Sequence, residues 1–293
     1  MEKALYFLSA TGLLLSTLKV YPYIHCFWSQ FLRPGHRLPA RYGPQSWVLI
    51  TGAATGIGFA FAKAFAELQF NLILIDRDPS VVHAANELQR RFQVQTLPIV
   101  ADLMQTSMPK LAEKWSDLDV SVLVNNAGVH SFEPFATTSR ETIASVISLN
   151  VGALTKLTHT LLPKLAARPY KSAIINMSSI AGLVPTPLSA VYSATKAYIR
   201  AFSLALEAET DLDVLAVEPA TVKTNMTSWI PRSYFLIEPD LLVTRVLGTL
   251  GYERETIGAK RHMAQYEQVR WRSLEVQVSA RYLRMQLLRV NTA

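Results

Sequence analysis

The sequence predicts an α/β fold in which a single doubly wound parallel sheet is flanked by helices. An N-terminal membrane segment and a C-terminal helical tail are expected at its two ends. Short apolar runs alternate with stretches of helical spacing through residues 47–218, and this order is typical of a parallel sheet with helices on both faces. A glycine-rich turn, residues 51–58, joins the first apolar run to the first helical stretch, which is a context that favours phosphate binding.

Six strands and four main helices follow from these patterns. The strands are expected at residues 47–50, 71–76, 96–100, 120–124, 172–178 and 213–218, and the helices at 59–68, 81–91, 140–163 and 190–207. Short apolar runs bounded by turn residues predict strands, whereas apolar residues three or four apart predict helices. A seventh strand has one candidate, residues 255–257.

The glycine turn is the first candidate binding site, and it comprises Thr51, Gly52, Thr55, Gly56, Ile57 and Gly58. Glycines let a pyrophosphate approach the backbone, and the next helix offers free N–H groups at its N-terminus. For such a motif alone, a tight turn without a ligand is the alternative. Asp76 ends the second strand, where a carboxylate reaches an adenosine ribose. Capping of a helix ahead of Pro79 is the alternative for Asp76.

Tyr192 and Lys196 form the second candidate site. They lie four residues apart on a predicted helix and therefore share one face of it. A tyrosine hydroxyl has a pKa of about 10, and a nearby ammonium group favours the phenolate. We therefore expect Lys196 to lower the pKa of Tyr192 toward the range in which it exchanges protons. The pair alone would indicate an ordinary helix surface, but Asn150 and Ser179 accompany it.

Together these motifs resemble those of the single-domain, Rossmann-type short-chain dehydrogenase/reductase family. The resemblance covers residues 45–228, and the motifs occur in the order and spacing of the family. They are the glycine turn, Asn125-Asn126-Ala127-Gly128, Asn150, Ser179, Tyr192 with Lys196, and the loop at residues 219–224. The resemblance implies hydride transfer with a nicotinamide cofactor. By the same resemblance Ser179 holds the substrate oxygen, Tyr192 exchanges the proton, Lys196 also holds the nicotinamide ribose, and Asn150 anchors a proton-relaying water chain.

The resemblance also implies the cofactor contacts. Besides Tyr192 and Lys196, they are Thr51, Gly52, Thr55, Gly56, Ile57, Gly58, Asp76, Arg77, Asp102, Leu103, Asn125, Ala127, Gly128, Pro219, Val222 and Thr224. Asn126 matches a residue that stabilises the central sheet. Ala220 departs from the family, which has a glycine at that point. No Cys and His cluster has metal-ligand spacing, so no metal is expected.

The cofactor type depends on Asp76 and Arg77. The N-terminal region resembles membrane-bound 17β-hydroxysteroid dehydrogenases and very-long-chain 3-oxoacyl-CoA reductases, which mostly use NADPH and carry a neutral residue followed by Arg here. Asp76 would instead hydrogen-bond the 2′-hydroxyl of NAD and repel the 2′-phosphate of NADP. We therefore expect NAD(H). NADP(H) is the alternative if Asp76 turns away and Arg77 takes over.

Residues 1–32 are expected to be membrane-associated. Residues 4–18 are largely apolar, and an aromatic-rich run continues to residue 32, which together reach membrane length. The basic residues that follow indicate a cytosolic side, with a linker at 33–44 and the dehydrogenase domain at 45–258. The endoplasmic reticulum is the expected membrane and the mitochondrial membrane the alternative. An amphipathic helix or one packed on a partner is the alternative to membrane anchoring. A secretory signal is disfavoured because its cleavage site would lie too early, and the single cysteine, Cys26, fits a reducing compartment.

The end of the chain, residues 259–293, is expected to be a basic helical tail. Seven Lys and Arg residues against two Glu give it +5 of the formal net charge of +7. The rest of the chain is nearly neutral, so nucleic acid is not an expected partner. An apolar stripe at Leu274, Val278, Tyr282, Met285 and Leu288 could dock on a membrane or on a partner. Residues 226–238 lie where the family places its substrate lid, and their apolar content suits a lipid, steroid or acyl chain. Packing against a membrane or a partner subunit is the alternative for this segment.

Two functions remain from the sequence. The favoured one is an NAD(P)-dependent oxidoreductase, of the alcohol dehydrogenase or carbonyl reductase type, for a steroid, fatty-acyl or other lipid substrate. The alternative is a non-catalytic subunit of a membrane complex, held by its two unusual ends. A homodimer or a membrane-complex partner bound through the tail is expected with either.

Overall fold

A seven-stranded parallel sheet forms the centre of the computed structural model, which describes residues 37–228 and 234–271. The strand order is β3-β2-β1-β4-β5-β6-β7. The strands are β1 (Trp47–Thr51), β2 (Asn71–Asp76), β3 (Thr96–Val100), β4 (Val120–Asn125), β5 (Ala173–Met177), β6 (Asp213–Val217) and β7 (Glu255–Thr256). The doubly wound sheet is thus confirmed, and the weak candidate for a seventh strand pairs with the end of β6.

The order of the strands reverses between β1 and β4. From β1 the chain builds outward through β2 to β3, then returns to place β4 on the other side of β1. Ligands of such sheets bind outside the carboxyl ends of the strands at this point of reversal. Pro98 is tolerated in β3 because β3 is an edge strand.

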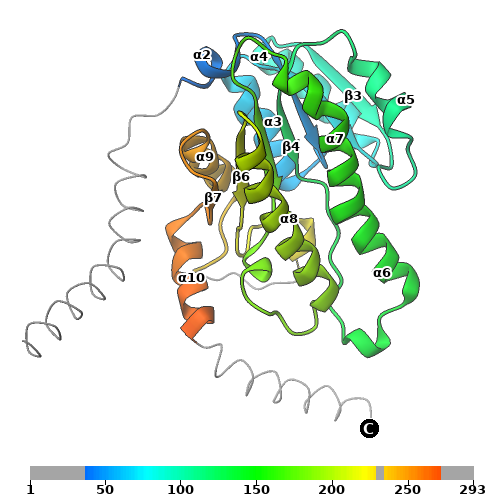
Figure 1. Ribbon diagram of the computed structural model, residues 1–293, viewed down its shortest axis with the longest axis vertical. Helices are drawn as coiled ribbons and strands as arrows, with labels where there is room; N and C mark the ends of the chain where they lie inside the picture. The colour runs from blue at the N-terminus through cyan, green and yellow to red at the C-terminus, as the bar shows by residue number, and fades with distance from the viewer. Residues whose placement is uncertain (1–36, 229–233, 272–293) are drawn as a thin grey trace, which may run out of the picture. The chain divides into compact units, whose positions relative to one another are not determined.

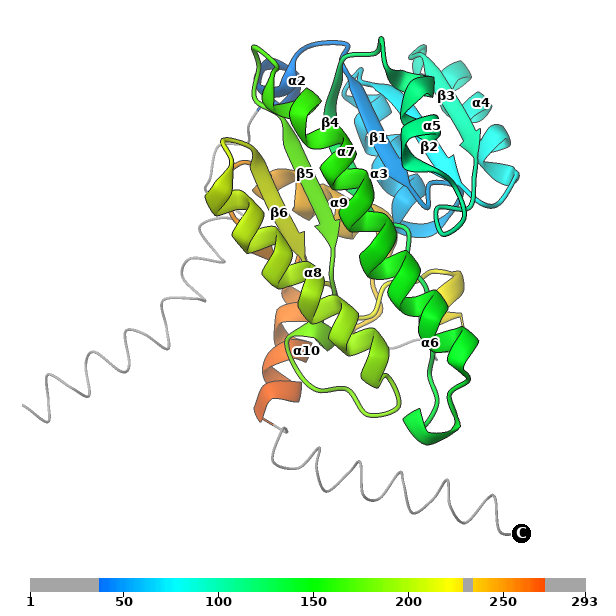
Figure 2. The same ribbon diagram turned by 45° about the vertical axis from the view of Figure 1, so that its right-hand side comes forward.

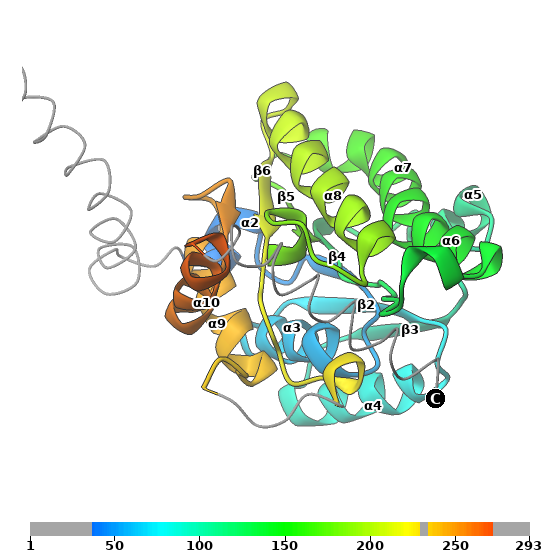
Figure 3. The ribbon, with the colours of Figure 1, turned by 90° about the horizontal axis from the view of Figure 1, so that it is seen from below.

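Helices cover both faces of the sheet (Figures 1 and 3). One face carries α3 (Gly56–Glu67), α4 (Ser80–Phe92) and α9 (Pro239–Thr249). The other carries α5 (Met108–Ala112), α7 (Leu154–Ala166) and α8 (Ala190–Glu209). Alternate strand residues point to opposite faces, so that Val48 and Ile50 join the first core and Leu49 joins the second.

A π-helical segment interrupts the long helix that the sequence predicts at residues 140–163. The chain forms α6 (Arg140–Ile147), the π-helical turn η3 (Ser148–Ala153) and then α7. Figure 2 shows α6 and α7 as one continuous rod in front of β4, with α8 crossing in front of β6. Such π-segments are frequent at functional sites, and this one contains Asn150.

The expected linker at residues 33–44 is partly helical. Helix α2 (Leu38–Tyr42) packs on the domain with Leu38 and Tyr42 buried. Arg41 makes a two-pronged ion pair with Asp213, at 2.6 and 2.8 Å, and the Tyr42 hydroxyl donates to the same carboxylate at 2.7 Å. These long-range bonds attach α2 to the start of β6, so the folded domain begins before residue 45.

Several expectations fall on residues that the structure leaves undescribed. They are the membrane segment at 1–32, the apolar stripe of the tail beyond residue 271, and the middle of the 226–238 segment. Within the described part of the chain, no helix has the length and apolar character needed to cross a membrane.

Candidate active site

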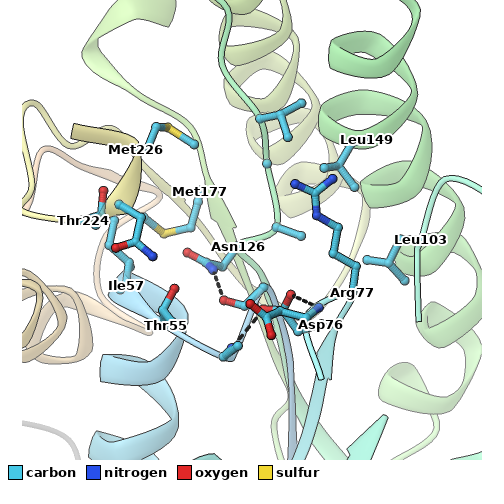
Figure 4. A pocket seen from close by; sticks show the side chains of 18 of the residues that line it. Thr55, Ile57, Asp76, Arg77, Leu103, Asn126, Leu149, Met177, Thr224 and Met226 are labelled. Carbon is cyan, nitrogen blue, oxygen red and sulfur yellow. Dashed lines mark hydrogen bonds between the residues drawn. The ribbon is translucent and has the colours of Figure 1, made fainter. Parts of the chain in front are cut away.

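A cavity of about 420 Å³ opens at the carboxyl ends of the strands, where the strand order reverses (Figure 4). Its wall begins at the glycine turn, continues past the ends of β2 and β3 and the loop after β4, and ends at Ser179, α8 and the loop after β6. Its size is typical of small-molecule and cofactor sites, which measure roughly 300–1,000 Å³. The two candidate sites of the sequence are therefore parts of one cavity.

The backbone of the glycine turn favours glycine at three positions. Gly52 and Gly56 have φ values of +64° and +60°. A Cβ on Gly58 would lie 2.0 Å from the carbonyl oxygen of Gly52, so a side chain there would collide with the turn. The side-chain amide of Asn126 donates to the carbonyls of Thr51 and Gly52, both at 3.0 Å, and fixes the turn from the sheet side.

This turn fits the diphosphate of a dinucleotide. Helix α3 begins at Gly56, and its N-cap residue Thr55 makes no side-chain capping bond. The first N–H groups of a helix lack partners within the helix and attract anions. The bare turn thus presents backbone donors and a positive dipole end to the cavity.

Asp76 is held firmly at the end of β2. One carboxylate oxygen accepts from the backbone N–H of Ala54 at 2.9 Å, and the other accepts from the N–H of Asp78 at 3.0 Å. Figure 4 shows these bonds and shows the longer Arg77 side chain reaching into the same cavity. Asp102 and Leu103, which follow β3, line this half of the cavity as well.

Ser179, Tyr192 and Lys196 come together at the other half of the cavity. The Ser179 hydroxyl accepts from the N–H of Ala181 at 3.2 Å and donates to the carbonyl of Pro219 at 3.4 Å. The Lys196 ammonium donates to the Met177 carbonyl at 2.7 Å and lies 5.4 Å from the centre of the Tyr192 ring. Helix α8 places Tyr192 and Lys196 on one face, as the sequence predicts.

The protein environment shifts both titratable groups. Burial raises the pKa of Tyr192 to about 12, although a hydrogen bond with Ser179 opposes the change. Burial also lowers the pKa of Lys196 to about 8. The expectation that Lys196 lowers the pKa of Tyr192 is therefore not met in this structure, because desolvation of the hydroxyl outweighs its other interactions.

Asn150 lies behind the cavity wall. Its side-chain oxygen accepts from the N–H of Val129 at 2.9 Å, and its amide nitrogen donates to the carbonyl of Val129 at 3.0 Å and to the Thr195 hydroxyl at 3.1 Å. Asn150 thereby joins the loop after β4 to α8. Its role in a water relay stays a prediction.

The other predicted contacts divide into residues that line the cavity and residues that support it. Lining residues are Gly52, Thr55, Gly56, Ile57, Asp76, Arg77, Asp102, Leu103, Ala127, Gly128, Pro219, Val222 and Thr224. Thr51, Gly58 and Asn125 do not line it. The Thr51 hydroxyl accepts from the N–H groups of Asn126 and Ala127. The Asn125 amide donates to Thr158 on α7 and to Asn176 on β5. Asn126, expected to stabilise the sheet, both clamps the turn and lines the cavity.

His130 is a neighbour of the site that sequence reasoning missed. Its ring meets the Tyr192 ring edge to face, with 4.4 Å between centroids, and its Nε2 lies 2.9 Å from the Ser189 hydroxyl. Burial, followed by the charge of Lys196, lowers the pKa of His130. Its place two residues after the Asn-Asn-Ala-Gly motif is the one sequence signal that could have indicated it.

Comparisons with known proteins agree with this geometry. The family model described as short chain dehydrogenase matches residues 46–233. A very-long-chain 3-oxoacyl-CoA reductase of Aspergillus oryzae is 33% identical over 257 residues, which are 84% of this chain and 74% of the relative. Very-long-chain 3-oxoacyl-CoA reductase-A of Danio rerio is 31% identical over 267 residues, covering 88% of this chain and 83% of the relative.

Solved structures share the fold. A 7β-hydroxysteroid dehydrogenase superimposes with a TM-score of 0.72 at 27% identity, covering 78% of this chain and 93% of the other. A short-chain dehydrogenase from Sphingobium yanoikuyae in complex with NADPH superimposes with a TM-score of 0.68 at 28% identity, covering 80% of this chain and 95% of the other.

Proposed function

We propose that the substrate of this protein is a long fatty-acyl chain carrying a 3-oxo or 3-hydroxyl group. The chain belongs to the short-chain dehydrogenase family. It is an NAD(P)-dependent oxidoreductase that interconverts a hydroxyl and a carbonyl group. One observation carries the proposal: the glycine turn and the Ser179, Tyr192 and Lys196 group line one continuous cavity. The names of the Aspergillus and Danio relatives support the acyl substrate. Steroids and other lipid alcohols are the alternatives within the same reaction type.

The side chains have distinct tasks in this proposal. A bound nicotinamide supplies or accepts the hydride at the substrate carbon. Ser179 holds the substrate oxygen by a hydrogen bond, and Tyr192 gives that oxygen a proton in reduction or takes it in oxidation. Lys196, kept in place by the Met177 carbonyl, holds the ribose next to the nicotinamide and adds positive charge near the tyrosine.

The turn and Asp76 would hold the other end of the cofactor, and we favour NAD(H). NADP(H) would require Asp76 to move away from the ribose, which would break its bonds to the N–H groups of Ala54 and Asp78. Hydrogen bonds to a charged group contribute about 1.5–3 kcal/mol each. That cost, added to the repulsion of a 2′-phosphate, supports the preference.

The apolar part of the cavity supports a lipid substrate. Leu149, Met177 and Met226 line it from three separate elements (Figure 4). Methionine is unbranched and adapts to irregular apolar ligands. Together with the apolar N-terminal segment, this supports an enzyme at the endoplasmic reticulum membrane whose catalytic domain faces the cytosol and receives its substrate from the lipid phase.

Turnover of defined acyl chains tests the proposal. Full-length protein in detergent is given NADH and 3-oxoacyl-CoA substrates of increasing chain length, and the loss of NADH absorbance is followed. Rates should rise with chain length. Reduction of a steroid ketone but of no acyl chain would contradict the acyl substrate. Cofactor binding without turnover of any carbonyl or alcohol would favour the non-catalytic subunit.

A further inference from the structure

A fully buried histidine connects the C-terminal helix to the loop after β6. His262 lies in the first turn of α10 (Lys260–Trp271) and is 0% exposed. Its Nδ1 accepts from the backbone N–H of Ala220 at 3.2 Å, and its Nε2 lies 3.1 Å from the carbonyl oxygen of Thr221. A backbone N–H only donates and a carbonyl only accepts. The ring is therefore neutral, with its proton on Nε2.

The loop that His262 holds forms one wall of the cavity. Pro219, Ala220, Val222 and Thr224 face the cavity, while the histidine bonds the backbone of the same loop. The carbonyl of Pro219 also accepts from the Ser179 hydroxyl at 3.4 Å and from the N–H of Ile180 at 3.1 Å. A displacement of this loop would therefore change both the wall of the cavity and the setting of Ser179.

Helix α10 reinforces this attachment beyond the histidine. Gln265, one turn further along, donates to the Thr221 hydroxyl at 3.5 Å. Arg261 lies over the ring of Tyr234 at 4.8 Å, next to the chain that returns to the loop through the Val222–Ile237 bridge. Figure 1 shows α10 below α9 and next to β7, the edge strand of the sheet.

The order of the strands assigns the loop to one half of the cofactor. Asp76 and Asp102 follow β2 and β3 on one side of β1, whereas Ser179 and the loop follow β5 and β6 on the other. A dinucleotide spans such a reversal, with one nucleotide on each side. With the adenosine at Asp76, the loop borders the nicotinamide, and this assignment rests on the proposed function.

We propose that His262 is a positioning residue for the nicotinamide half of the cofactor, and that it makes α10 a structural part of the binding site. In its neutral form the ring holds the loop against the cavity. A protonated ring would turn a second N–H toward the N–H of Ala220, and two donors cannot bond each other. Acid would then release the loop and weaken binding of the nicotinamide.

The surroundings of the ring favour the neutral form. Burial is the main cause that lowers the pKa of His262, opposed by the backbone carbonyls of Thr221, Ile257 and Phe235. Polar groups at this junction include those carbonyls, the N–H of Ala220, the Thr221 hydroxyl and the side chain of Gln265. Lys260 and Arg261, beside it on α10, are exposed on the helix surface.

Two ligands separate loop positioning from general damage. ADP-ribose carries the adenosine, the diphosphate and the second ribose but no nicotinamide ring, whereas NADH carries that ring as well. Full-length wild type, His262→Leu, His262→Gln and the exposed α10 control Gln268→Ala are titrated with each ligand by fluorescence, and thermal melting checks the fold. Leucine would leave the N–H of Ala220 and the carbonyl of Thr221 without their bonds to the ring. We therefore expect His262→Leu to lower the affinity for NADH by at least about 10-fold and the affinity for ADP-ribose by less than about twofold.

The glutamine variant supplies the rescue and the pH test. Its amide can both accept from Ala220 and donate to Thr221 but cannot be protonated, so at about pH 7.5 it should bind NADH nearly as wild type does. At about pH 5.5 wild type should lose NADH affinity more than His262→Gln does. Equal loss of both ligands in a folded His262→Leu, or no loss of either, would overturn the proposal, as would an unchanged acid response in His262→Gln. If wild type bound none of NADH, NADPH and ADP-ribose, the proposed function itself would fail.

Discussion

The two halves of the cavity are built in different ways. The half at β2 and β3 is formed by residues close together in the sequence. Asp76, at the end of β2, bonds the glycine turn, and only α3 separates that turn from β2. The half at β5 and β6 depends on contacts from distant parts of the chain: Asn150 to Val129 and Thr195, His130 to Ser189, and His262 to Ala220. In the proposed function the first half would select the nucleotide, and the second would align the reacting groups. Substitutions in the two halves should therefore affect different measured quantities.

The largest effect is expected from Tyr192→Phe. Loss of a general acid or base lowers turnover by about 10²–10⁴-fold, and kcat should fall while the dissociation constant of NADH stays within about threefold of wild type. Tyr198→Phe is the matched control, because Tyr198 lies on the same helix but is exposed and bonds Thr155. Wild-type turnover by the Tyr192→Phe variant would contradict the proposal that Tyr192 transfers the proton.

Asp76→Asn should act on the other half. Removing the charge relieves repulsion of a 2′-phosphate and weakens the bond to a ribose hydroxyl, so the ratio of NADH to NADPH affinity should fall by roughly 10–100-fold. Turnover at saturating NADH should change little. Asp211→Asn, which alters an exposed carboxylate that does not line the cavity, serves as the control. An unchanged ratio would mean that Asp76 does not select the cofactor.

The smallest effect concerns acid stability, which the β5 and β6 half should dominate. Burial lowers the pKa values of His130 and His262. Below about pH 6.5 these two imidazoles therefore bind protons more readily in the unfolded chain than in the folded chain. Their contribution to stability is complete above that pH and is lost as the pH falls, by at most about 1.4 kcal/mol per pH unit for each histidine. Thermal melting between about pH 7 and 5 should show a smaller decline in His130→Gln than in wild type. His83→Gln, at an exposed position, serves as the control substitution.

The sequence predicts the first half of the site better than the second. Glycines, a strand-ending acid and a helix start are local signals, and each predicted residue from Gly52 to Leu103 except Gly58 lines the cavity. Asn125 and Asn126 illustrate the limit: adjacent strand-end residues point in opposite directions, and the register of β4 puts Asn125 into the sheet and Asn126 into the cavity.

Tertiary contacts explain what the sequence could not supply. His262 carries no pattern of its own, because its partners are backbone groups about 40 residues earlier, joined only by folding. Desolvation of Tyr192 likewise depends on the packed cavity rather than on its spacing from Lys196. The sequence predicts a linker where α2 lies, because the stretch contains proline and glycine. Bonds from Arg41 and Tyr42 to the distant Asp213 stabilise the helix there.

A titration of the wild-type protein with NADH and NADPH, followed by nicotinamide fluorescence, tests the central claim most directly. The claim is that one cavity holds a nicotinamide dinucleotide across both halves, with Asp76 selecting the adenosine end. Saturable binding of both, with NADH the tighter, is the predicted result. Absence of binding for both nucleotides would contradict the cavity as a cofactor site, and tighter NADPH would contradict the role of Asp76.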